Sequence, residues 1–419
     1  MSEAFEAAKR HFLQGLAQMQ AGEAAAAELS FEASLKCVPG RVSTLTNLGA
    51  VRVSLGKFTE ALAVLEEAVN GDTHNAPAWG YQGQALLALK QPAQALPCLV
   101  RAVALEPGNL MVRLLRSEAE LALDLRLPAL ASLDAALAID PAAALAWSNR
   151  GMLLRDLHRL DEAAASFERA IETGGDAQLN GYYLASLRGT TPANAPRAYV
   201  EKLFDGYAED FSGHLVQALN YRSHERLVAR LRARHPARFS RVLDVGCGTG
   251  LCGALIRPVA DHLEGLDISA VMVEKARLAG IYDRLTHGDA QAHLRSLAAA
   301  GAPDGGAARF DLILAADVFN YVGELAAIFA ASREALKPGG ALCFTVELLA
   351  PKEASCDANL QLRTSLRYAH SEAYLRRAAA DCGLAVDEMV HAPMREDQGV
   401  EIAGLLVFMS RPKTPANAL

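Results

Sequence analysis

The sequence lacks several features that would assign it to a class at once. It has no apolar run of the roughly 20 residues that a membrane span requires. It has no basic block, since 41 Lys and Arg stand against 48 Asp and Glu, and the net charge of −7 argues against nucleic acid as a partner. Its seven cysteines, an odd number, are scattered without the paired spacing of a metal site or a disulfide framework. The opening residues, Met1–Glu6, lack the cationic start and apolar core of a signal peptide. We therefore expect a cytoplasmic protein that binds no metal, no membrane and no nucleic acid.

The chain does have enough apolar material for more than one core. Hydrophobic residues make up 51% and charged residues 21% of its 419 positions, which is ordinary for a folded protein. This length accommodates two domains.

Residues 8–177 repeat with a period of 34. One column of the repeat holds small residues: Gly15, Gly49, Gly83, Ser117 and Gly151. A second column holds alanines: Ala27, Ala61, Ala95, Ala129 and Ala163. A third column is large and apolar: Phe31, Leu65, Leu99, Leu133 and Phe167. The period and the small–large pattern resemble the tetratricopeptide (TPR) repeat, which implies helix pairs stacked into a solenoid.

Other columns of the repeat bear on how the solenoid works. Both tryptophans, Trp79 and Trp147, fall on one repeat position. Asn47 and Asn149 share another, and their amides either face a groove and pair with a ligand's backbone or pair within the solenoid. The resemblance implies a protein or peptide partner in the groove, although self-association is an alternative; the oligomeric state is left open.

The stretch Leu243–Gly250, LDVGCGTG, reads as a buried strand that turns through glycines into a helix. Backbone without Cβ atoms approaches a ligand closely, and the following helix presents free N–H groups to it. Gly248, Gly250 and Gly253 also satisfy the dinucleotide pattern G-x-G-x-x-G, but the turn already begins at Gly246. Asp244 favours a cationic ligand over a pyrophosphate.

Val242–Gly250 resembles motif I of class I S-adenosylmethionine-dependent methyltransferases, whose cofactor is a sulfonium. The resemblance extends over residues 199–410 and implies a cofactor site of eleven residues: Asp244, Gly246, Cys247, Gly248, Gly250, Asp267, Ile268, Met272, Asp289, Ala290 and Tyr207. NAD binding and a ligand-free glycine turn are the alternatives. It names no methyl acceptor.

Two downstream acids follow expected strands. Asp267 stands about 20 residues after the glycine turn, where an acid accepts from ribose hydroxyls; otherwise it caps the next helix, for which Ser269 is the better residue. Asp289, by the resemblance, accepts from the adenine amino group, and its alternative is a solvated turn acid. Ile268 and Met272 either flank the adenine ring or belong to the core.

Alternating strands and helices after residue 236 predict an α/β Rossmann-like domain with a seven-stranded, mostly parallel sheet. The expected later strands are 310–315, 341–348 and an antiparallel pair, 385–393 and 402–410. A helix over 324–336 should end at Lys337–Gly340, because Pro cannot extend a helix and Gly supplies a left-handed cap. The predicted domains are a TPR solenoid (1–188), a linker (189–198), a helical cap over the cofactor site (199–235) and the methyltransferase domain (236–413).

Methyl transfer requires a positioned acceptor and a route for its proton. Asp317 and Tyr321 follow the fourth strand, where the resemblance places acceptor-side residues, and His370 precedes a late helix. These three are the candidate catalytic residues; Tyr207 and His214, from the cap, are further candidates for moving the proton. We expect a methyltransferase whose solenoid recruits a protein. The alternatives are a scaffold without turnover, and a small-molecule methyltransferase whose repeats self-associate.

Overall fold

The computed structural model describes residues 3–207, 222–235, 237–299, 309–350, 359–397 and 400–413. The chain forms two compact units, Met1–Asn180 and Gly181–Leu419. Among the described residues, no helix combines the length and the apolar character that crossing a membrane requires.

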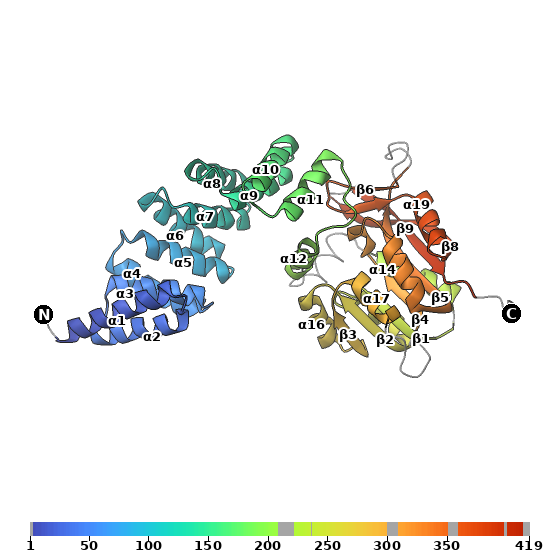
Figure 1. Ribbon diagram of the computed structural model, residues 1–419, viewed down its shortest axis with the longest axis horizontal. Coiled ribbons are helices and arrows are strands. Elements are labelled where there is room, and N and C mark those ends of the chain that lie inside the picture. Colours follow the sequence, from blue (N-terminus) through green and yellow to red (C-terminus); the bar gives the residue numbers. More distant parts are fainter. Residues whose placement is uncertain are drawn as a thin grey trace. The chain divides into compact units, whose positions relative to one another are not determined.

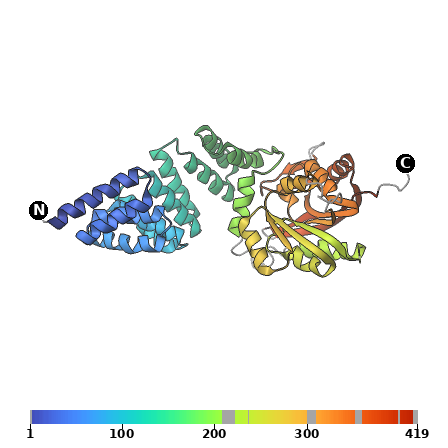
Figure 2. The same cartoon turned by 60° about the horizontal axis from the view of Figure 1, so that its bottom comes forward.

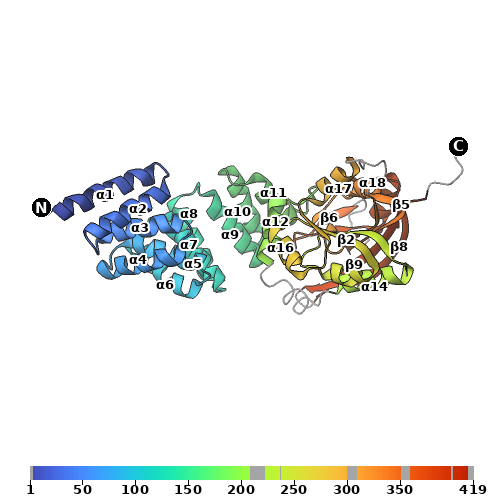
Figure 3. The ribbon, with the colours of Figure 1, turned by 90° about the horizontal axis from the view of Figure 1, so that it is seen from below.

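The first unit consists of helices in which each packs against the next (Figure 3). Their bounds are α1 Glu3–Gln20, α2 Ala24–Cys37, α3 Val42–Ser54, α4 Phe58–Gly71, α5 Ala76–Ala88, α6 Pro92–Leu105, α7 Leu110–Ala122, α8 Arg126–Ile139, α9 Ala144–Asp156 and α10 Leu160–Glu172. Helix α11 (Ala177–Arg188) crosses the division between the units. Two helices per 34 residues confirm the TPR prediction.

The small and large columns of the repeat meet inside each helix pair. A Cβ atom added at Gly15 would stand 2.7 Å from the Phe31 ring, and one at Gly83 would stand 2.5 Å from Leu99. Gly151 faces Phe167 in the same way, at 2.7 Å. This repeat position must therefore be small, because the large residue of the partner helix fills the space that a longer side chain would need.

Polar side chains at repeated positions satisfy the solenoid's own backbone. The indole N–H of Trp79 donates to the carbonyl of Thr73 at 3.1 Å, and that of Trp147 donates to the carbonyl of Pro141 at 2.9 Å. Both carbonyl acceptors lie in the turn between consecutive repeats, six residues before the tryptophan. The Asn47 amide donates to the Ser43 carbonyl of its own helix at 2.7 Å, so its pairing within the solenoid is the alternative that the structure shows.

The second unit is built on one nine-stranded sheet (Figure 1). The strands are β1 Phe239–Val245, β2 Ala260–Asp267, β3 Arg284–His287, β4 Phe310–Ala315, β5 Leu336–Leu348, β6 Leu360–Leu362, β7 Tyr368–His370, β8 Ala385–Asp397 and β9 Val400–Ser410. The order β3-β2-β1-β4-β5 is parallel throughout. Two further strands pair with β5. Strand β9 runs antiparallel to residues 341–347, and β7 pairs in parallel with the last residues, Glu347 and Leu348.

Helices cover both faces of this sheet, as Figure 2 shows from a second side. One core joins the sheet to α17 (Ala290–Ala299), α18 (Ala326–Ala335) and α19 (Glu372–Asp381). The core on the other face includes residues of α14 (Ser223–Arg234) and α15 (Leu251–Ile256). Because both faces are buried, the central strands read as continuous apolar runs.

All seven predicted strands are present, and the predicted antiparallel pair is β8–β9. The short β6–β7 hairpin was not predicted, because three-residue strands carry too little pattern. Ser269 caps α16 (Ala270–Ala279) as expected, accepting from the Met272 N–H at 3.1 Å.

The helix before β5 ends within one residue of the predicted position, but the predicted stop signal, Lys337–Gly340, does not cap it. Helix α18 ends at Ala335, and residues 336–340 already belong to β5, where Leu336 pairs with Phe310. Gly339 has the expected positive φ of 83°, yet it lies inside the strand and donates to the Arg411 carbonyl at 2.7 Å. The pairing with β4 and the C-terminal segment overrides the local capping signal.

Candidate active site

A cavity of about 550 Å³ opens at the carboxyl ends of the parallel strands, within the second unit. Its walls begin where each strand stops: Gly246–Gly248 after β1, Asp267–Ile268 after β2, Gly288–Gln291 after β3 and Ala316–Val318 after β4. Helix α12 (Arg197–Tyr207) contributes to the wall as well. This volume lies within the range of ligand pockets, and in open α/β sheets ligands bind at this edge.

The turn after β1 is shaped by glycine. Gly246, Gly248 and Gly250 have φ values of 65°, 53° and 102°, a region that side chains other than glycine rarely adopt. A Cβ at Gly246 would also overlap Val318 of the loop after β4. The turn therefore brings bare backbone to the cavity wall.

Asp267 ties this turn to the next strand. One carboxylate oxygen accepts from the Gly248 N–H at 2.8 Å, and the other accepts from the Ser269 N–H at 2.9 Å. The side chain is 6% exposed, and burial raises its pKa, an effect opposed by these backbone donors. Each oxygen has a second lone pair, so Asp267 can still accept from a ligand hydroxyl while it holds the turn.

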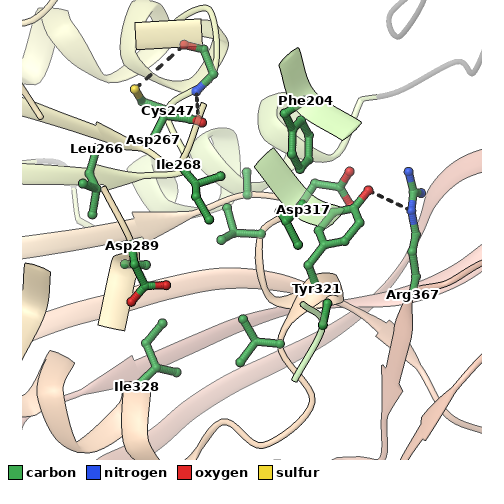
Figure 4. A pocket seen from close by; sticks show the side chains of 18 of the residues that line it. Phe204, Cys247, Leu266, Asp267, Ile268, Asp289, Asp317, Tyr321, Ile328 and Arg367 are labelled. Atoms are coloured by element: carbon green, nitrogen blue, oxygen red, sulfur yellow. Dashed lines mark hydrogen bonds between the residues drawn. The ribbon is translucent and has the colours of Figure 1, made fainter. Parts of the chain in front are cut away.

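Asp289 lines the same cavity, below Leu266 in the view of Figure 4. One of its oxygens accepts from the Ala292 N–H at 2.8 Å, which caps the start of α17. Ala290, Ile268 and Ile328 line the neighbouring wall and give it an apolar surface. Asp289 is thus a helix cap that also faces the cavity, and its contact with an adenine amino group stays a prediction.

Three predicted cofactor residues lie behind the turn instead of on the cavity wall. Asp244 is buried, and its carboxylate accepts from the Tyr282 hydroxyl at 2.7 Å; burial raises its pKa to about 7. Gly250 packs toward the same Tyr282 ring, and Met272 is fully buried in the core. Asp244, Gly250 and Met272 therefore stabilise the turn and its surroundings from behind and do not line the cavity.

Asp317 and Tyr321 form the opposite wall (Figure 4). Asp317 has a φ of 59°, a strained value for a residue with a side chain, and its N–H donates to the Thr345 hydroxyl at 2.8 Å. Burial raises the Asp317 pKa to about 6, opposed by the nearby Arg367 and by a hydrogen bond from Asn320. A carboxylate with this pKa is suited to proton transfer near neutral pH.

Tyr321 follows on the short helix Phe319–Tyr321. Its hydroxyl accepts from the Nε of Arg367 at 3.1 Å, and the Phe204 ring meets its ring edge-on at 5.3 Å between centroids. Burial raises the Tyr321 pKa to about 12, so the phenol stays protonated at neutral pH. Tyr207, at the end of α12, also lines the cavity.

His370 does not lie on the cavity wall, which corrects its place among the candidates. Its ring is fully buried, Nε2 lies 2.9 Å from the Gly323 carbonyl, and it stacks on Tyr374. Burial lowers its pKa to about 4, so the imidazole is neutral. His370 holds the backbone after the short helix 319–321.

Other predictions are limited by position. Cys247 lines the cavity but is buried, and burial raises the pKa of its thiol, so it remains an unreactive small residue. His214, the other candidate from the cap, lies outside the described residues. Among the described residues, no group of three or more His, Cys, Asp and Glu is arranged to hold a metal ion.

Sequence reasoning missed Tyr282, Arg367 and Arg395. Arg367 and Arg395 line the cavity, and Tyr282 supports Asp244. No local motif marks them, because each reaches the site from a segment distant in sequence. The one available signal for Arg395 was a charged residue just after the predicted strand 385–393, where the strand continues into the protein interior.

The parallel sheet, the glycine turn and the cavity at the strand ends define the class of α/β proteins that bind a nucleotide-like cofactor. Residues 216–388 match the family model described as methyltransferase domain, and residues 52–119 and 144–173 match models described as tetratricopeptide repeat. The chain belongs to the methyltransferase family and carries TPR repeats in its first half.

Three similar proteins are named as methyltransferases. Malonyl-[acyl-carrier protein] O-methyltransferase of Enterobacter lignolyticus is 32% identical over 171 residues, 40% of this chain and 60% of that protein. Ubiquinone biosynthesis O-methyltransferase of Cereibacter sphaeroides (strain ATCC 17025) is 34% identical over 28% of this chain and 45% of its own length. That of Thiobacillus denitrificans is 30% identical over 40% of this chain and 75% of its own length. The chain thus spans about half the length of the first two relatives.

Two solved structures show partial similarity to the chain. N-methyltransferase NodS from Bradyrhizobium japonicum WM9, in complex with S-adenosyl-L-homocysteine, is 19% identical, with a TM-score of 0.38 over 51% of this chain and 99% of that one. YrrB, a TPR protein with an unusual peptide-binding site, is 23% identical, with a TM-score of 0.37 over 41% of this chain and 89% of that one.

Proposed function

We propose that this chain is an S-adenosylmethionine-dependent methyltransferase whose TPR unit recruits a protein or peptide partner. The observation that carries the proposal is the Gly246–Gly248 turn, hydrogen-bonded to Asp267 at the wall of the cavity. The methyl acceptor is unidentified. The names of the relatives, all O-methyltransferases, favour an oxygen atom.

The residues of the cavity fit the cofactor. Two carboxylates, Asp267 and Asp289, face the cavity from the ends of β2 and β3. Both oxygens of Asp267 and one oxygen of Asp289 accept from backbone N–H groups, which fixes the direction of each side chain. Carboxylates suit ribose hydroxyls, an adenine amino group and a cationic ligand. The apolar side chains of Ile268, Leu266 and Ile328 provide a surface for a flat ring.

When bound, the cofactor supplies a methyl group on a positively charged sulfur, which needs no further activation. The chain's own residues then position the acceptor and exclude water. Phe204 and Tyr321 pack edge-on at the cavity wall and limit the entry of solvent. Asp317, ionised above its pKa of about 6, is placed to accept the proton that a hydroxyl acceptor must lose.

Calorimetric titration of S-adenosylmethionine into the full chain tests this proposal. We expect one site with micromolar affinity; the absence of binding at high micromolar cofactor would contradict it. Incubating a lysate with labelled cofactor and the protein, then separating label in proteins from label in small molecules, identifies the acceptor class. Methyl transfer to any acceptor excludes a scaffold without turnover, and Asp317→Asn should lose turnover while it retains cofactor binding.

A further inference from the structure

A buried arginine, Arg395, lies at the cavity wall. Arg395 is 5% exposed, and its Nη2 donates to the Glu347 carboxylate. Its Nη1 has no hydrogen-bond partner among the described residues and stands 3.9 Å from the Asp317 carboxylate, too far for a hydrogen bond. Burying a guanidinium N–H without an acceptor costs free energy, so a ligand that supplies an acceptor would bind favourably here.

The strand is specially bent to place this arginine. Residues that alternate along a strand point to opposite faces, yet the consecutive Met394 and Arg395 are both buried. The register of β8 against β9 shifts between Pro393 and Arg395, which makes Met394 the extra residue of a β-bulge. The Ser223 hydroxyl donates to the Met394 carbonyl at 2.7 Å and so stabilises the bulge. Bulges commonly redirect a side chain at a functional site.

A second guanidinium lies on the same side of the cavity. Arg367 lines the wall, and its Nε donates to the neutral hydroxyl of Tyr321 at 3.1 Å. Glu347, which pairs with Arg395, is shared with Arg363 at 2.8 Å. Asp317 and Glu347 each interact with both Arg367 and Arg395, and with Arg363 three guanidinium groups stand against these two carboxylates among the described residues. The cluster therefore attracts further negative charge.

We propose that the methyl acceptor carries a carboxylate, which binds between Arg367 and Arg395 and holds the acceptor against the methyl donor. A planar carboxylate matches the planar fork of a guanidinium and offers acceptors to both arginines. Phe204 and Tyr321 supply apolar and aromatic contact for the rest of the molecule. This inference rests on the proposed function, since it names the class of compound that the same cavity takes.

Small probes test the carboxylate site directly. Ligand-observed NMR titration of the full chain, with and without S-adenosyl-L-homocysteine, gives dissociation constants for acetate and benzoate beside their neutral amides, acetamide and benzamide. We expect each acid to bind at least about tenfold more tightly than its amide. Arg395→Gln and Arg367→Gln should each weaken acid binding roughly 10- to 150-fold, the value of a hydrogen bond to a charged group.

The controls separate charge recognition from folding. Arg230→Gln changes an arginine of α14 that pairs with Glu388 outside the cavity, and should leave acid binding unchanged. Arg367→Gln is the safer test for stability, because its bonded partner is a neutral hydroxyl. Amides that bind as well as acids, acids that do not bind at all, or a preference that survives both substitutions in folded protein would overturn the inference. Loss of S-adenosyl-L-homocysteine binding alone, with acid preference intact, would contradict the proposed function instead.

Discussion

Replacing Asp267 with alanine is the sharpest single perturbation of the cofactor site. The side chain is 6% exposed and accepts from two backbone N–H groups, those of Gly248 at 2.8 Å and Ser269 at 2.9 Å. Asp267→Ala removes the tie that fixes the glycine turn and also removes the expected acceptor for the ribose hydroxyls. Both losses act on the bound state, so cofactor affinity should fall.

The magnitude follows from the hydrogen bonds. Contacts to a charged group contribute about 1.5–3 kcal/mol, which corresponds to a loss of affinity of roughly 10- to 150-fold. Backbone donors left without an acceptor cost about 1–3 kcal/mol each in the free energy of unfolding, unless water reaches them. Asp267→Asn retains one oxygen acceptor, so its loss of affinity should be smaller than that of the alanine variant.

Titration calorimetry with S-adenosyl-L-homocysteine measures the affinity, and circular dichroism checks the fold. Asp261→Ala is the matched control, because Asp261 lies at the other end of β2 and pairs with the exposed Arg238. A folded Asp267→Ala protein whose affinity stays within twofold of wild type would refute the assignment of Asp267.

Three further changes test the packing and electrostatics. Gly246→Ala should lower the free energy of unfolding by about 1–3 kcal/mol in denaturant titrations, because φ is 65° and the new Cβ overlaps a neighbouring loop. Gly288→Ala is the control: its Cβ meets no atom within 4 Å, so the free energy of unfolding should hardly change. Gly83→Ala should destabilise the TPR unit by a similar amount, since its Cβ would stand 2.5 Å from a leucine; an unchanged melting temperature would argue against that packing. Asp244 has a folded pKa of about 7 against an unfolded value of about 3.9, so the folded state binds more protons between these values and the group's contribution to stability declines as pH rises through them. Wild type should therefore lose stability relative to Asp244→Asn from about pH 4 to pH 7, and parallel pH profiles would contradict this.

Much of the fold was readable because its signals are local and repeated. The small and large columns of the 34-residue period describe contacts that the structure contains, such as Gly83 against Leu99. The apolar strands and the Ser269 cap were also predicted, since each is encoded within a few residues. The early start of β5 at Leu336 was not, because the pairing of Leu336 with Phe310 depends on a strand 26 residues away.

The same distinction between local and long-range signals applies to the candidate site. The cofactor side follows the strand–turn–helix pattern, and Asp267 and Asp289 lie on the cavity wall. The acceptor side depends on side chains that converge from β8 and the segment before β7, so Arg395 and Arg367 carry no local signature. Asp244 belongs to the motif yet lies behind the turn, because Tyr282, 38 residues later, occupies the space beside it.

A crystal structure of the full chain grown with S-adenosyl-L-homocysteine tests the central claim most directly. We expect the ligand to lie along the Gly246–Gly248 backbone, with its ribose at Asp267, its adenine near Asp289 and its sulfur directed toward Asp317. Ligand bound at another place, or a cavity that stays closed at saturating concentration, would contradict it.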